Sequence, residues 1–282
     1  MPFTVSHAAV ALPFARTRVV PAAVAVGAMT PDLPLFLRLN GPLYGASHDL
    51  LMLPATMIVA FGLLLVWWLL LRPAVRALAP AWLATRLPDR WDERGRSVLR
   101  TAIPTAGSAC WLALALAVGV VSHIVWDAFT HEGRFGSLLV PALGALWGPL
   151  PGYRWLQYGT GALGLTVLAV GGVLWLRGRP PRPLSRRATR PIRAGWMLAL
   201  PALLVIAWVI GTVIYGPPDA DFTVRHLAYR VLPPACAVWA VLTLVLCVVV
   251  ARPDRAAHDP MRGARATRPV EGPDLPGTPG SA

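Results

Sequence analysis

Apolar residues gather in long uninterrupted stretches along this chain, and short polar segments separate them. Five stretches are long enough to cross a bilayer as an α-helix, which takes roughly 20 residues. They lie near residues 51–71, 105–126, 157–176, 195–215 and 233–251. The pattern therefore predicts an all-α fold, a polytopic membrane helical bundle with about five transmembrane helices.

A further apolar stretch, about 19–37, is interrupted by Pro31, Asp32 and Pro34. Proline breaks helices, and a carboxylate is costly at bilayer depth. We expect a short helix over about 5–15, a second over about 19–30, and then a turn. Together these would form an N-terminal broken or re-entrant helical element, which is tolerated where it lines a cavity in the protein.

The composition agrees with a membrane protein. Hydrophobic residues make up 56% of the 282 residues and charged residues only 14%, with a mean hydropathy of +0.57. Soluble domains carry about 25% charged residues. The three cysteines stand singly in apolar segments, so neither a thiolate metal site nor a disulfide framework is expected.

The net charge of +13 could indicate nucleic acid or anionic lipid as a partner, but its distribution favours another origin. All the basic residues are arginines. Segments 72–104 and 177–194 hold seven each and the tail after 251 holds five, whereas segments 127–154 and 216–232 hold two each. The positive-inside rule predicts this alternation. We therefore expect a bacterial cytoplasmic (inner) membrane protein with a cytoplasmic C-terminus, the lipid bilayer as partner, and no nucleic acid.

The same composition shifts predict four segments along the chain. They are a motif-bearing membrane domain (1–176), a cytoplasmic Arg/Pro linker (177–194), two further transmembrane helices (195–251) and a disordered basic tail (252–282).

The strongest candidate chemistry is the run Ser122–His131 at the end of the second apolar stretch. Ionisable residues in an apolar span usually mark a function. His123 and Asp127 are four residues apart, ~6 Å along a helix, so both could bind one ion. His131 is too far along a straight helix. Either the helix ends near Thr130 and His131 folds back, or Asp127 bridges two ions. The alternative is an interfacial helix end with a capped His123 and a solvated His131.

Other polar residues gain interest from topology. His48 precedes the first span, so the predicted orientation places it on the same external face as the Ser122–His131 run. Asp49 could orient the His48 ring or cap the next helix. Taken alone, His7 fits a surface or capping histidine and Asp32 an Asx turn. Glu132, directly after the run, is a candidate general base.

Four motifs together carry a resemblance to a known family. They are Met1-Pro-Phe-Thr-Val-Ser-His7, Gly27-Ala-Met-Thr-Pro-Asp32, Ser47-His48 and Ser122-His-Ile-Val-Trp-Asp-Ala-Phe-Thr-His131. In this order they resemble an uncharacterised bacterial multi-span membrane family of the domain-of-unknown-function 4184 type, over roughly residues 1–175. That family is distantly similar to inner-membrane proteins classed by inference as metal-dependent hydrolases, some of them described as LexA-binding.

The resemblance implies a metal site built from all four motifs. Its ligands would be His7, Asp32, His48, His123, Asp127 and His131. Imidazoles and carboxylates without thiolate favour a divalent metal, zinc first, with manganese or iron as alternatives. Asp32 or Glu132 would serve as the catalytic base.

These features predict a membrane metal-dependent hydrolase with its site at the external face, acting on a phosphoester or a lipid headgroup. One alternative is a transporter or permease that uses the His/Asp cluster for protons or cations. Another is a non-catalytic membrane scaffold. Transport would predict polar residues in the last three spans, which have few.

Overall fold

The computed structural model describes residues 4–37, 39, 41–93, 95–184 and 187–251. The described part is helical apart from one two-stranded hairpin. Five helical segments are long and apolar enough to cross a membrane, which confirms the predicted all-α membrane bundle. They are Leu50–Leu78, Ala106–Thr130, Gly152–Arg177, Arg190–Tyr215 and Val224–Val250. The predicted basic tail, 252–282, lies outside the described residues.

The N-terminal region is a chain of short helices, as predicted. Its elements are the 3-10 helix η1 (Thr4–Arg16), α1 (Pro21–Met29), the 3-10 turn η2 (Thr30–Asp32), α2 (Leu33–Phe36) and α3 (Pro42–Ser47). Pro21 starts α1, where its missing N–H costs nothing. With nine residues, α1 is only about 14 Å long, less than half of the hydrocarbon thickness.

Helix α1 is nevertheless deeply buried, because it packs against α8 (Ala106–Thr130) at two glycines. A Cβ built on Gly27 would lie 2.6 Å from the carbonyl oxygen of Leu116, and one on Gly119 would strike the backbone of α1. Ala23 and Ala28 are fully buried in the same contact. The two backbones therefore meet with no side chain between them.

The first span is longer than predicted. It runs through η3 (Leu50–Met52), α4 (Leu53–Val66), the π-helical turn η4 (Trp67–Leu71) and α5 (Arg72–Leu78). The arginine at position 76 marked the predicted loop, but its side chain is only 2% exposed. It donates hydrogen bonds of 2.6 Å to Asp89 and Asp92. Because these carboxylates neutralise the guanidinium, the helix continues to Leu78.

Short elements lie between the first and second spans and between the second and third spans. These are α6 (Ala81–Ala84), η5 (Asp89–Asp92) and α7 (Arg96–Ala102), then α9 (Phe135–Leu139), α10 (Pro141–Gly144), β1 (Leu146–Trp147) and β2 (Leu150–Pro151). Gly148 has a φ of 73° in the hairpin turn, a left-handed conformation that favours glycine. Helix α11 (Gly152–Arg177) follows and packs on η1 and α8.

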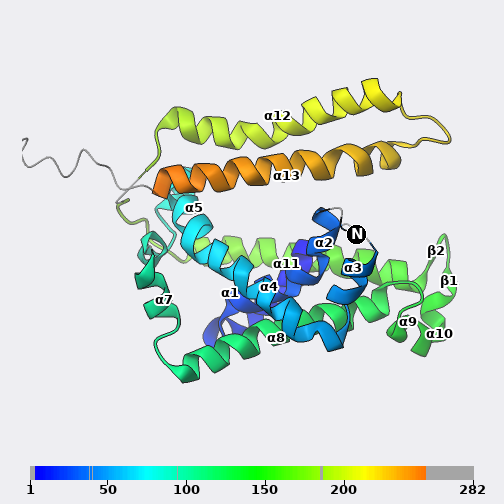
Figure 1. The fold of residues 1–282 in the computed structure, drawn as a ribbon, viewed down its shortest axis with the longest axis horizontal. Coiled ribbons are helices and arrows are strands. Elements are labelled where there is room, and N and C mark those ends of the chain that lie inside the picture. The colour runs from blue at the N-terminus through cyan, green and yellow to red at the C-terminus, as the bar shows by residue number, and fades with distance from the viewer. Residues whose placement is uncertain (1–3, 38, 40, 94, 185–186, 252–282) are drawn as a thin grey trace, which may run out of the picture.

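The last two spans, α12 (Arg190–Tyr215) and α13 (Val224–Ala251), form a hairpin along one side of the molecule (Figure 1). Gly211 of α12 is buried against Leu227 and Val231 of α13. The hairpin joins the rest where Cys247 packs on Ala74 and Leu78. This arrangement leaves α1, α4, α8 and α11 packed together as a separate group (Figure 1).

Candidate metal centre

Four buried polar side chains converge at one end of the α1–α4–α8 group. They are Asp32, His48, His123 and Asp127, and one oxygen or nitrogen atom of each lies within 4.8 Å of the others. Three segments contribute: η2, the end of α3, and α8. The predicted topology put His48 and His123 on one membrane face, and in the structure the two rings meet; this group could hold a metal ion.

The separations between these atoms suit ligands of a single ion. The Nε2 atoms of His48 and His123 lie 3.2 Å apart, and each is 3.4 Å from Oδ2 of Asp127. Oδ1 of Asp32 lies 3.6 Å from His123 Nε2 and 3.9 Å from His48 Nε2. A tetrahedral zinc with ligands at about 2.0–2.1 Å separates its ligand atoms by about 3.3–3.4 Å.

The backbone fixes the tautomer of both central histidines. Nδ1 of His48 lies 2.9 Å from the carbonyl oxygen of Tyr44, and Nδ1 of His123 lies 2.7 Å from that of Ala28. A carbonyl only accepts, so each Nδ1 carries a hydrogen, and in the neutral ring Nε2 then presents a lone pair to the cluster. Both carbonyls belong to the ends of short helices, where intrahelical donors are missing. A bond from the distal ring nitrogen to a carbonyl is the usual support of a metal-binding histidine.

Asp32 reaches the cluster because the chain turns sharply after α1. Its Oδ2 accepts a hydrogen bond of 2.5 Å from the hydroxyl of Thr4. Its Oδ1 is buried and has no hydrogen-bond partner among the described residues. A buried carboxylate oxygen without a donor is costly, and such an atom calls for an explanation such as an ion.

The electrostatics of the cluster also suit a cation. Asp32 and Asp127 are both buried, and among the described residues their ion pairs involve only histidines. Two buried carboxylates without an arginine or lysine leave a charge of −2 if the imidazoles are neutral. A divalent cation would neutralise that charge.

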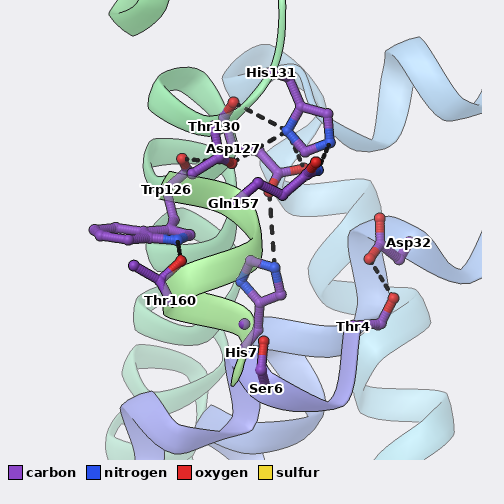
Figure 2. Close-up of a pocket in the computed structure, with 11 residues that line it drawn as sticks. Thr4, Ser6, His7, Asp32, Trp126, Asp127, Thr130, His131, Gln157 and Thr160 are labelled. Carbon is purple, nitrogen blue, oxygen red and sulfur yellow. Dashed lines mark hydrogen bonds and ion pairs between the residues drawn. The ribbon is translucent and has the colours of Figure 1, made fainter. Parts of the chain in front are cut away.

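His7 and His131 flank Asp127 on either side of this cluster (Figure 2). His7 Nε2 lies 3.7 Å from Oδ1 of Asp127, and its ring packs against that of His123 with 4.1 Å between centroids. Burial, together with the neighbouring His123, lowers the pKa of His7 to about 4. His7 is therefore neutral at pH 7, the form that a ligand requires.

His131 folds back because α8 ends at Thr130, one of the two arrangements that the spacing allowed. Its backbone is extended, with φ −124° and ψ 145°. Nδ1 of His131 then lies 3.5 Å from Oδ2 of Asp127, and its Nε2 lies 3.0 Å from the amide nitrogen of Gln157. Sequence reasoning missed Gln157, although an amide within an apolar span was a usable signal. Burial lowers the pKa of His131 as well.

A small cavity of about 30 Å³ adjoins the cluster. Figure 2 shows its walls, which include Thr4, His7, Asp32, Asp127 and His131. A cavity needs about 10–15 Å³ measured in this way to hold one water. There is thus room for one or two water molecules beside the predicted ligands.

The other polar residues considered for the site lie outside the cluster of Asp32, His48, His123 and Asp127. Glu132 is exposed and accepts a hydrogen bond of 2.9 Å from the hydroxyl of Tyr153. Asp49 caps η3 by accepting from the amide of Leu51, so a backbone carbonyl rather than Asp49 orients His48. Arg134 lies one side chain away from the cluster: its guanidinium is 5.9 Å from the centre of the Tyr44 ring, and that ring lies 4.2 Å from the His48 ring between centroids. Sequence reasoning gave no role to the Tyr44 and Ala28 carbonyls, which leave no trace in side-chain types.

Comparison with known protein families identifies the family of this chain. The model described as "Domain of unknown function (DUF4184)" matches residues 1–252, so the chain belongs to this family and the predicted resemblance is confirmed. No curated protein and no solved structure matches it.

Proposed function

We propose that this member of the DUF4184 family is an integral-membrane metal-dependent hydrolase whose centre is the His/Asp cluster. The observation that carries the proposal is the pair of Nε2 atoms, His48 and His123, 3.2 Å apart with both hydrogens committed elsewhere. Two lone pairs repel at this distance unless a proton or a cation lies between them. The partnerless oxygen of Asp32 at 3.6 Å from His123 favours a cation.

In this proposal Asp32, His48, His123 and Asp127 hold a divalent ion, with zinc first and manganese or iron as alternatives. Such an ion, when bound, lowers the pKa of a coordinated water to about 7 and supplies a nucleophile near neutral pH. His7 and His131 border the water-sized cavity. Their neutral rings would orient a water there or contact a second ion.

The proposed substrate is a phosphoester or a lipid headgroup. Arg134 supports this choice because a guanidinium beside the cluster can pair with phosphate oxygens. Since Asp32 serves as a ligand here, Glu132 is the proposed base; it lies outside the cluster and would have to leave Tyr153 and move toward the cavity to accept a proton from the water. The arginine distribution supports a site at the external face of a bacterial inner membrane, with the C-terminus in the cytoplasm.

Metal analysis tests the centre. Purified full-length protein and a His123→Ala/Asp127→Ala variant are compared by elemental analysis, with His226→Ala, an exposed histidine outside the cluster, as the matched control. We expect near-stoichiometric metal in the wild type and the control and a loss in the double variant. Equal metal in all three proteins would overturn the proposal.

Phosphate release from phosphoesters then tests the reaction. We expect release that EDTA abolishes and added zinc or manganese restores, and that the double variant lacks. A metal-loaded protein that hydrolyses no phosphoester but moves cations across vesicle membranes would instead favour the transporter alternative.

A further inference from the structure

An apolar groove lies between the N-terminal region and α13, close to the cluster. Its volume is about 350 Å³, within the range of ligand-binding pockets. Apolar side chains dominate its walls: Leu35 and Phe36 from the α2 helix, and Ala228, Leu232, Pro233 and Cys236 from α13. Figure 1 shows α2 on the side of the front half that faces α13.

Thr4 connects this groove to the cluster. It lines the groove and also the small cavity beside Asp127. Its hydroxyl donates to Asp32, one of the proposed ligands. The groove therefore lies one side chain, that of Thr4, away from the proposed metal centre.

The groove becomes polar toward the segment between α12 and α13. There it meets a wider cavity of about 700 Å³, which shares Leu35 and Pro233 and adds His226 and Arg230. An apolar groove bordered by polar groups suits an amphiphile, whose chain would occupy the groove while its headgroup lies among the polar groups. A soluble phosphoester would leave the apolar walls unused.

The groove borders a candidate membrane span, which indicates that the amphiphile is a membrane lipid. One wall is α13, a candidate membrane span, and the other includes Phe36, which is 54% exposed. In a bilayer such apolar surface is in contact with hydrocarbon rather than water. We propose that the groove binds an acyl chain of a membrane glycerophospholipid and so presents the lipid phosphate to the His/Asp cluster. The role of the phosphate rests on the proposed function, whereas chain binding does not.

Cys236 provides a direct test, because it is an exposed thiol in the groove. Cys110 is also exposed and Cys247 is buried, so Cys110→Ser leaves Cys236 as the accessible thiol of the described residues. The rate of maleimide alkylation is measured on the full chain in detergent micelles, with and without dioleoyl phosphatidate. At ten times its Kd the lipid should slow alkylation about tenfold. Glycerol phosphate, the headgroup without chains, should give no protection.

A matched pair of variants locates the effect. Ala228→Trp fills the groove, whereas Ala240→Trp makes the same change at an exposed position of the same helix. We expect lipid protection to vanish in the first and to persist in the second. Equal protection in both variants would overturn the proposal. Alkylation of wild-type Cys236 at the same rate with and without the lipid would also overturn it, since the lipid would then not occupy the groove.

The outcome separates this inference from the hydrolase proposal. Protection of Cys236 by a lipid that is never hydrolysed would support the groove and refute hydrolysis of that lipid. Hydrolysis of a soluble phosphoester without any lipid protection would support the hydrolase and refute the groove.

Discussion

The contact between Gly27 and α8 allows one substitution to test how helix packing positions the proposed metal centre. Gly27→Ala adds a Cβ that would lie 2.6 Å from the carbonyl oxygen of Leu116, whereas ordinary contact begins at 3.4 Å. The difference is 3.4 − 2.6 = 0.8 Å. Because the opposing atom is backbone, it cannot rotate away, and α1 and α8 must separate by on the order of 0.8 Å.

That displacement reaches the cluster through the next residue. The carbonyl of Ala28 holds Nδ1 of His123 at 2.7 Å, and Asp32 follows in the same segment. Ligand distances in metal sites lie within about 0.2 Å of their preferred values, so a shift of this size would disturb the ligand set. Loss of a supporting hydrogen bond typically costs 10–100-fold in metal affinity. We therefore expect Gly27→Ala to weaken metal binding at least about tenfold, besides an overpacking cost of about 1–3 kcal/mol in stability.

Gly62→Ala is the matched control, because its Cβ would have open space in a spanning helix. Metal affinity is measured by competition with a chromogenic chelator, and folding by the melting temperature in detergent. A Gly27→Ala protein that melts lower but binds metal as tightly as Gly62→Ala would refute the link between this crossing and the centre.

Three further predictions concern the proposed centre and the junction that Arg76, Asp89 and Arg182 form through ion pairs. Thr4→Val removes the donor to Asp32 and should weaken metal binding about 10–100-fold in the same competition assay; Thr166→Val, in an exposed part of α11, should bind as the wild type does. Chelation by EDTA should lower the melting temperature, since an ion at 100 times its Kd contributes about 2.7 kcal/mol, and a melting temperature unaffected by EDTA would contradict this. Hydrogen bonds from Arg182 and Arg76 lower the pKa of Asp89. Ionised Asp89 therefore stabilises the fold fully at pH values above its ordinary pKa, near 3.9. This stabilisation is lost as the pH falls through the lower pKa that Asp89 has in the folded state. Asp89→Asn should flatten the fall in melting temperature below about pH 4, and an unchanged pH profile would count against the junction.

Much of the fold and part of the centre were predictable from local pattern. Apolar length gave the five spans, and the interval of four gave His123 and Asp127 on one face of α8. The arginine distribution added His48 through topology. The partners His7 and Asp32 came from the family motifs, because nothing in their immediate sequence distinguishes them from a capping histidine and a turn.

The remainder depends on tertiary contacts that residue types do not encode. The first span passes its predicted end because Asp89 and Asp92 come back to neutralise Arg76. The tautomers depend on carbonyls of Tyr44 and Ala28, and every residue has a carbonyl.

The short helices α2 and α3 have a consequence for the order in which the molecule forms. Four and six residues are too few for a helix to persist alone in water. An ion shared by His48 and His123 would join positions 75 residues apart. It would act as a cross-link that lowers the entropy of the unfolded chain and benefits from the long loop it closes. Insertion of the long helices would come first and ion capture would then dock the N-terminal region. Amide exchange over residues 30–48 should therefore accelerate on chelation while exchange in α12 does not. The centre would in this way complete the fold as well as carry the chemistry.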